Sequence, residues 1–256
     1  MKIEKIIKKN SNQYKLILSD GNSLSFYDDV IINNNLIMDK NLDKKKIDKL
    51  AKENNLYKAY YEALKLIKAK LRTKKEINNL LLKKEYNHEE INFVINKLSK
   101  QGYINEEMYI KCFISDAYNL KNIGPNKIKY ELKKLGLSEE NINNELDNYQ
   151  DMWQEKIENI VKKEIKINHT YSNKVLESKI KTKLITKGFN KEDIKKYVVI
   201  NNDKENEILI NIFNKELNKI AKKNKGNELK QKLRSKLYGK GFSLQEIDKI
   251  ISEKDL

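Results

Sequence analysis

Few side chains in this sequence have the types and spacing that catalysis or metal binding requires. The two histidines, His88 and His169, stand far apart, and neither has cysteines or carboxylates at the close spacing of zinc ligands. Cys112 precedes the apolar Phe113 in a predicted helix, which favours a packed side chain over a nucleophile. The segment "NIGPNKI" has too little glycine for a phosphate-binding loop, and its Gly-Pro pair is typical of a helix start. The sequence therefore predicts no enzyme, no metal site and no cofactor.

The strongest chemical signal is positive charge. The chain has 53 lysines and arginines against 37 acidic residues, a formal net charge of +16. Such a charge favours a polyanionic partner such as a nucleic acid or a nucleoprotein. Arg72 and Arg234 are the only arginines, so contacts to a nucleic acid would be mostly to phosphate rather than bidentate to guanine. A compositional bias toward lysine, isoleucine and asparagine is the alternative explanation of the charge.

An eight-residue pattern occurs four times, about every 52 residues, and describes a corner between two helices. Its copies are "KEYNHEEI" from Lys84, "LGLSEENI" from Leu135, "KGFNKEDI" from Lys187 and "KGFSLQEI" from Lys240. The glycine at the second position of the last three copies is typical of the left-handed residue that ends a helix. The Asn or Ser at the fourth position, with Glu, Asp or Asn three residues later, predicts an N-cap or a capping box for the next helix.

Apolar residues at helical spacing flank each corner and recur upstream of it, which predicts three helices in each copy. We expect a mainly α protein whose tandem three-helix repeats stack into an elongated, curved body. Near the N-terminus, "YKLIL", "SDGN" and "SLSFY" predict a β-hairpin, to which "KIEKII" adds a third strand. The expected segments are a β domain over 1–42, a linking helix over 43–55 that Asp43 caps, and repeats over 56–105, 106–151, 152–202 and 203–256.

Basic residues recur at fixed places relative to these corners. Lys129, Lys181 and Arg234 share one place, and Lys84, Lys187 and Lys240 share another. Equivalent places in stacked repeats would align basic groups along one face, although duplication without function gives the same recurrence. With Arg72, Lys183 and Lys236 added, the candidates for contact with a nucleic acid or nucleoprotein are Arg72, Lys84, Lys129, Lys181, Lys183, Lys187, Arg234, Lys236 and Lys240.

The sequence also suggests where the protein acts. One cysteine cannot form an internal disulfide, which fits a reducing cytoplasm. No apolar run approaches the roughly 20 residues that span a bilayer, and the N-terminus has no signal-peptide core. We expect a cytoplasmic, monomeric protein that has no membrane partner.

The segment from Tyr61 to Ile114 resembles the most characteristic part of the RecX family of recombination regulators. That part joins an "AL" helix, an Arg-Ser/Thr-x-x-Glu corner and a "GYINDExYA" segment, and "IGPNKIKYELKKLGL" and the N-terminal hairpin are similar to further parts of the family. The matching residues are Arg72, Thr73, Glu76, Gly102, Tyr103, Ile104, Asn105 and Tyr109. The sequence departs from the family at Glu106 and Ile110, at the first corner, which lacks its glycine, and in having four repeats rather than three.

This resemblance implies a non-enzymatic regulator of the RecA recombinase in DNA recombination, DNA repair and the SOS response. Such a protein would lie in the groove of the RecA filament on single-stranded DNA and restrain its ATPase, strand-exchange and co-protease activities. The matching residues also predict local structure, since Thr73 and Glu76 form a capping box pattern and Gly102 with Tyr103 predicts a helix end followed by an anchor. The alternatives are a direct DNA-binding protein built from helix-turn-helix-like modules and a purely structural helical scaffold.

Overall fold

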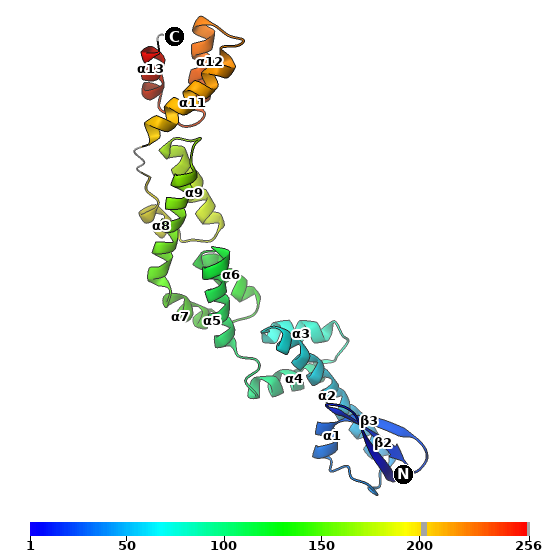
Figure 1. Ribbon diagram of the computed structural model, residues 1–256. Helices are drawn as coiled ribbons and strands as arrows, with labels where there is room; N and C mark the ends of the chain where they lie inside the picture. Colours follow the sequence, from blue (N-terminus) through cyan, green and yellow to red (C-terminus); the bar gives the residue numbers. More distant parts are fainter. Residues whose placement is uncertain (201–203, 255–256) are drawn as a thin grey trace. The chain divides into compact units, whose positions relative to one another are not determined.

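The structure is a computed structural model that describes residues 1–200 and 204–254. Helices make up most of these residues, and a small sheet lies near the N-terminus (Figure 1). The chain divides into two compact units, one of residues 1–112 and 133–138 and the other of residues 113–132 and 139–256. The predicted class, a mainly α chain of three-helix repeats with a small β domain, is confirmed.

The first unit begins with an antiparallel sheet in the order β1-β2-β3. The predicted hairpin is β2 (Gln13–Leu18) and β3 (Ser23–Tyr27), and the predicted third strand is β1 (Ile3–Asn10). Leu16, Leu18 and Phe26 are buried in the core that the sheet shares with the following helices. A short helix that the sequence analysis did not predict, α1 (Asp28–Asn33), follows β3 directly.

Helix α2 (Lys44–Ala69) is longer than the sequence predicted. It begins where expected, because the Asp43 side chain accepts a hydrogen bond from the Lys46 backbone N–H at 2.6 Å. It then continues through the expected boundary at residues 55/56, so the linking helix and the first helix of the first repeat are one helix. The expected boundary at 151/152 also falls inside a helix, and that at 202/203 lies outside the described residues. The division into repeats by residue number remains a prediction.

Charged and aromatic side chains attach α1 to α2 and to α4 (His88–Lys100). The Tyr61 hydroxyl oxygen lies 2.9 Å from Asp28 Oδ1 and 2.7 Å from Asp29 Oδ2, so the two carboxylates share its one hydrogen, and its ring stacks on that of Tyr27. Lys97 Nζ donates to Asp29 Oδ1 at 3.0 Å. Burial and the two carboxylates raise the pKa of Tyr61, so its hydroxyl stays protonated and continues to donate. The small sheet is therefore fixed to the first repeat through α1.

The remaining elements are all helical. In chain order they are α3 (Lys74–Leu82), α5 (Glu106–Asp116), the π-helical turn η1 (Ala117–Lys121), α6 (Pro125–Lys134), α7 (Glu139–Asp147), α8 (Gln150–Ile167), α9 (Asn173–Thr186), α10 (Lys191–Tyr197), α11 (Glu205–Ile220), α12 (Gly226–Tyr238) and α13 (Leu244–Glu253), with α4 between α3 and α5. Proline stands at the first position of α6, as predicted. The π-helical turn η1 was not expected from the sequence.

Each predicted corner has a left-handed residue where the pattern places one. Gly136, Gly188 and Gly241 have φ values of +81°, +84° and +91°. Glu85 takes the same place in the first corner with φ +65°, which an L-residue with a side chain rarely adopts. The absence of glycine from the first corner therefore changes the residue and not the backbone conformation.

The caps that follow the corners agree with the pattern in two cases. Asn87 with Glu90 and Ser243 with Glu246 form complete capping boxes at the starts of α4 and α13. The third corner differs, because the Asn190 side chain bonds to the Asp193 carboxylate at 3.3 Å and makes no capping bond to a backbone N–H. Asn190 is thus the N-cap residue of α10, as predicted, but the predicted side-chain capping bond is absent.

The corners also pack against the start of a helix in the preceding repeat, which the sequence analysis did not predict. The Gly124 N–H donates to Lys187 O at 2.8 Å, and the Asn126 N–H donates to Gly188 O at 3.0 Å. At the last corner, the Ser172 N–H donates to Lys240 O at 3.1 Å. A Cβ at Gly188 would lie 2.4 Å from Lys127 Cβ and 2.6 Å from Lys127 N. Glycine is thus required there for close backbone approach as well as for its positive φ.

Alanine substitutions of these glycines should separate the two requirements. Gly188→Ala should lower the free energy of unfolding by more than about 3 kcal/mol, because left-handed strain adds to a clash with backbone atoms. Gly102→Ala is the matched control: φ is +76°, but no atom lies within 4 Å of the added Cβ, so the loss should be about 1 kcal/mol. Urea denaturation followed by circular dichroism measures both. Equal losses in the two variants would contradict the close approach at Gly188.

Candidate interaction site

The Glu76 carboxylate is the centre of the corner that carries most of the family signature. Its Oε2 accepts from the Thr73 backbone N–H at 3.0 Å, and the Glu76 N–H donates to Thr73 Oγ1 at 3.2 Å, so the predicted capping box is complete. Its Oε1 pairs with Arg72 Nη1 at 3.1 Å. The Thr73 hydroxyl is buried and also donates to Leu135 O at 3.2 Å. The Glu76 carboxylate therefore caps the start of α3, orients the Arg72 side chain and holds Thr73 in place.

Tyr109 of α5 joins the same group. Its side chain is buried, and burial, together with the charge of Glu76 and a hydrogen bond to it, raises the pKa of Tyr109 to about 12. The phenol is thus a donor toward the Glu76 carboxylate at every physiological pH. Since Glu76 belongs to α3 and Tyr109 to α5, this bond ties the start of the second repeat to the first. The matching residues Arg72, Thr73, Glu76 and Tyr109 make one structural cluster.

The other matching residues form the turn between α4 and α5. Gly102 has φ +76° and ends α4, as predicted. The Asn105 side chain accepts from the Met108 N–H at 2.9 Å and so caps α5. The predicted anchor is wrong, because Tyr103 is 42% exposed whereas the neighbouring Ile104 is 6% exposed. The turn is held by Ile104, and the Tyr103 ring remains accessible to a partner.

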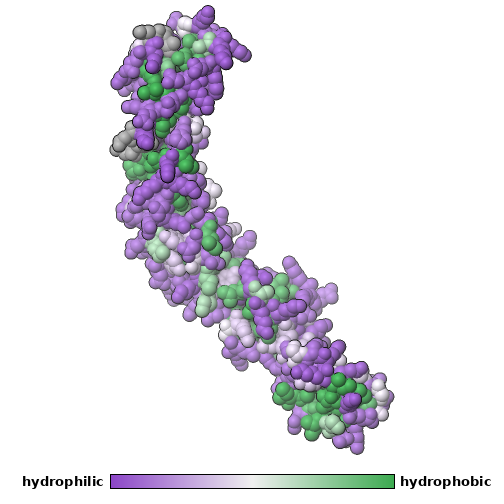
Figure 2. Space-filling model, in the orientation of Figure 1, coloured by the Kyte–Doolittle hydropathy of each residue, from purple (hydrophilic) through white to green (hydrophobic). Residues whose placement is uncertain are grey.

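Hydrophilic residues cover most of the visible face of the chain (Figure 2), yet most of the predicted basic contacts already have acidic partners. Six of the nine make ion pairs with carboxylates nearby in the fold. These pairs are Arg72 with Glu76 at 3.1 Å, Lys84 with Glu62, Lys129 with Glu139 at 2.6 Å, Lys181 with Glu177 at 2.5 Å, Lys183 with Glu164 at 2.5 Å, and Arg234 with Asp248 at 2.7 Å. The charge that remains available is therefore smaller than the number of lysines suggests.

The last three candidates differ from these six. Lys187 Nζ donates to the Asn122 carbonyl at 3.3 Å, while Lys236 and Lys240 make no side-chain ion pair with the described residues. Lys187 also lowers the pKa of Lys156, after the larger effect of burial. The nine candidates lie on α6, α9, α12 and at the corners, and among the described residues no side-chain hydrogen bond joins one of them to another. Whether they act as one surface remains a prediction.

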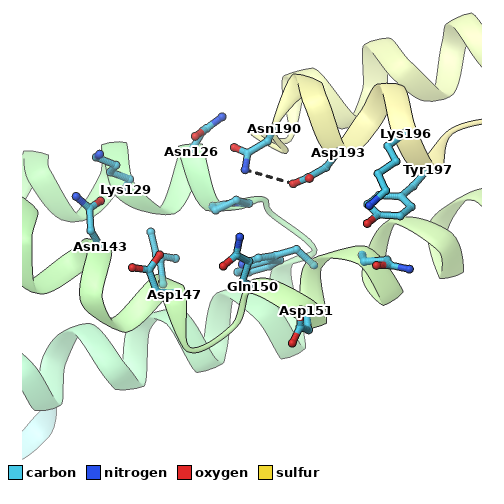
Figure 3. Close-up of a pocket in the computed structure, with 14 residues that line it drawn as sticks. Asn126, Lys129, Asn143, Asp147, Gln150, Asp151, Asn190, Asp193, Lys196 and Tyr197 are labelled. Atoms are coloured by element: carbon cyan, nitrogen blue, oxygen red, sulfur yellow. Dashed lines mark hydrogen bonds between the residues drawn. The ribbon is translucent and has the colours of Figure 1, made fainter.

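A polar pocket of about 580 Å³ lies among α6, α7, α8 and α10 (Figure 3). Its charged residues are Lys129, Lys196, Asp147, Asp151 and Asp193, and the rest of its lining is Pro125, Asn126, Asn143, Leu146, Gln150, Trp153, Gln154, Asn190 and Tyr197. The lining has no serine, threonine, cysteine or histidine that could act as a nucleophile or a general base with a neighbouring carboxylate. The pocket therefore offers hydrogen-bonding groups and charges of both signs.

Thr73→Ala should destabilise the first unit by about 2 kcal/mol, because it removes a helix cap and leaves the Leu135 carbonyl without its hydroxyl donor. Asn87→Ala removes the cap of an equivalent capping box whose residue is exposed, and should cost about 1 kcal/mol. Urea denaturation gives both values. If the two variants lose the same free energy, the Thr73 bond to Leu135 contributes nothing.

Residues 59–98 match the family model described as RecX, first three-helix domain. "Regulatory protein RecX" of Oceanobacillus iheyensis is 28% identical over 257 residues, which cover 96% of this chain and 94% of the relative. "Regulatory protein RecX" of Bacillus pumilus is 28% identical over 252 residues, covering 96% and 95% of the two chains. Matches of this extent include most of the N-terminal sheet and of the last three helices.

Solved structures share the fold. A crystal structure of a regulatory protein RecX has a TM-score of 0.68 and 24% identity, and covers 76% of this chain and 97% of its own. The crystal structure of RecX from Lactobacillus salivarius has a TM-score of 0.54 and 28% identity, and covers 57% and 96%. No helix in the described ranges is both long and apolar enough to cross a membrane. The chain is thus similar to the RecX family in its first three-helix domain and to proteins named regulatory protein RecX along nearly the whole of both chains, and it shares their fold.

Proposed function

We propose that this protein is a cytoplasmic regulator of the RecA recombinase. As a monomer, it binds in the groove of the RecA filament on single-stranded DNA and inhibits ATP hydrolysis, strand exchange and co-protease activity without catalysing a reaction of its own. The observation that supports this most directly is the match along nearly the full length of proteins named regulatory protein RecX. The signature cluster around Glu76 supports it further, because it builds the first repeat that the family model describes.

The ion pairs on the surface suggest how such a protein binds a polyanion. Exposed pairs such as Lys183 with Glu164 and Arg234 with Asp248 each contribute only about 0 to 1 kcal/mol. A phosphate or an acidic protomer surface can therefore replace the local carboxylate at small cost. Since the repeats present such groups many times, weak contacts at several repeats add up through their high effective concentration.

Adding the purified protein to RecA and single-stranded DNA should lower the rate of DNA-dependent ATP hydrolysis, while the protein alone should hydrolyse no ATP. A coupled ATPase assay measures both rates over a range of protein concentrations. An ATPase activity of the protein that survives repurification, or an unchanged RecA rate at saturating protein, would contradict the proposal.

Direct DNA binding is the alternative that the net charge of +16 favours. A direct binder should associate with bare single-stranded DNA at physiological salt, and its affinity should fall steeply as salt rises. A filament regulator should co-sediment with RecA filaments under conditions in which bare DNA does not retain it. A protein that binds neither would be a scaffold of helices.

Neutralising recurrent basic residues should test the predicted surface. We expect the combined variant Lys181→Gln, Lys187→Gln, Arg234→Gln and Lys240→Gln to bind filaments more weakly. Its stability should fall only modestly, because Arg234 is exposed and the other three side chains are half-buried rather than in the core. The matched control changes Lys44, Lys45, Lys46 and Lys49 at the start of α2 to Gln, so each set lowers the net charge of +16 by four. Co-sedimentation measures both. Equal losses would mean that net charge, and not position, governs binding.

A further inference from the structure

The two edges of the N-terminal sheet differ in how far the rest of the chain covers them with hydrogen bonds. At the β3 edge, the Asn54 side chain of α2 accepts from the Tyr27 N–H at 2.9 Å and donates to the Ser25 carbonyl at 3.4 Å. At the β1 edge, the described part of the chain bonds only to Ile3, whose N–H donates to Lys40 O and whose carbonyl accepts from the Asp39 N–H. No other described residue pairs with the rest of this edge of β1.

The register identifies which backbone groups face this open edge. The Leu18 N–H donates to Asn22 O, so the even-numbered residues of β2 bond to β3 and the odd-numbered residues bond to β1. Ile17 is opposite Lys5 and Lys15 is opposite Ile7, so Lys5 and Ile7 bond to β2. Ile6 and Lys8 therefore present their N–H and C=O groups to the open edge.

Next to the start of β1, another segment of the chain already pairs with this edge of the sheet. Lys2 and Asn41 form an antiparallel bridge, so the segment after α1 runs alongside the start of β1 as a fourth strand would. Next to this segment, Ile37 and Met38 are 60% and 59% exposed. Figure 2 shows hydrophobic residues gathered on the same N-terminal part of the chain. Added backbone could continue this pairing along β1 and cover apolar surface at the same time.

The charge of β1 selects the kind of segment that fits. Lys5, Lys8 and Lys9 are exposed and make no ion pair with a described residue, and Glu4 is the one acid in the strand. A second copy of this chain would place β1 lysines opposite one another, which is unfavourable between neighbouring strands. A nucleic acid could contact the lysines but would leave the alternating backbone donors and acceptors unpaired. An extended acidic peptide can pair with the lysine side chains and with the backbone donors and acceptors of the strand.

We propose that β1 binds an extended acidic segment of a partner protein as a fourth strand, through the backbone groups of Ile6 and Lys8 and the side chains of Lys5, Lys8 and Lys9. Lysines also protect exposed edges against unwanted pairing, and a protected edge would bind no peptide. The two explanations therefore differ in whether β1 binds an extended acidic peptide.

The probe is the fluorescein-labelled hexapeptide Glu-Val-Asp-Val-Glu-Val, titrated with the full chain and followed by fluorescence anisotropy. We expect saturable binding that weakens with salt. Glu-Pro-Asp-Pro-Glu-Pro has the same charge, but each proline lacks an N–H and holds φ near −65°, so this peptide pairs poorly as a strand and should bind at least about tenfold more weakly. No binding of the first peptide at millimolar protein, or equal binding of both, would overturn the proposal.

Two variants locate the site. Lys8→Pro removes the outward N–H of Lys8 and leaves the bonds of β1 to β2 intact, so it should weaken binding about tenfold or more while circular dichroism and the melting temperature stay near the parent values. Lys8→Gln is the control that removes the charge and keeps the donor, and its loss should be smaller. If Lys8→Pro unfolds the sheet, the parent chain is titrated with the peptide and followed by NMR instead. The backbone amide signals of Ile6 and Lys8 should then shift. Shifts confined to other residues, or dimers linked through β1, would contradict the proposal.

Discussion

The close approach of each corner to the start of a helix in the preceding repeat is the contact on which the repeats depend. At Gly188 and Gly241 the chain turns with positive φ and brings its backbone against Lys127 and Val175, where an added Cβ would lie 2.6 Å or less from neighbouring atoms. A small three-helix repeat cannot bury a complete core by itself, so contact with its neighbour stabilises both. A tight corner thus determines the fold of one repeat and its packing against the one before.

In the first unit, buried or half-buried polar groups join neighbouring helices to one another. Glu76 joins α3 to α5 through Tyr109, and Asp29 joins α1 to α2 and α4 through Tyr61 and Lys97. In both places a carboxylate receives a tyrosine hydroxyl and a cationic side chain, so its charge is compensated. Removing one partner would leave the others without compensation, which costs more than the lost bond itself.

The sequence predicted what depends on neighbouring residues. Corner glycines, the capping boxes at Thr73 and Asn87, and the hairpin follow from local chemistry, and the structure has them. The failures involve contacts between distant residues. The pattern could not show that α2 continues past residue 55, that Ile104 rather than Tyr103 is buried, or that most basic candidates have carboxylate partners elsewhere in the fold. The exchange of a cap for a side-chain bond at Asn190 likewise depends on rotamers that a sequence does not specify.

The recurring corner contact also limits how a protein of this kind can change length. The Gly124 and Asn126 amides meet Lys187 and Gly188, and the Ser172 amide meets Lys240, so the same two surfaces recur along the chain. Loss or gain of a whole repeat leaves a corner facing an equivalent helix start, whereas an insertion within a helix would move the corner out of place. Such chains can therefore evolve in steps of about 52 residues, the period of the corner pattern, more readily than by single residues.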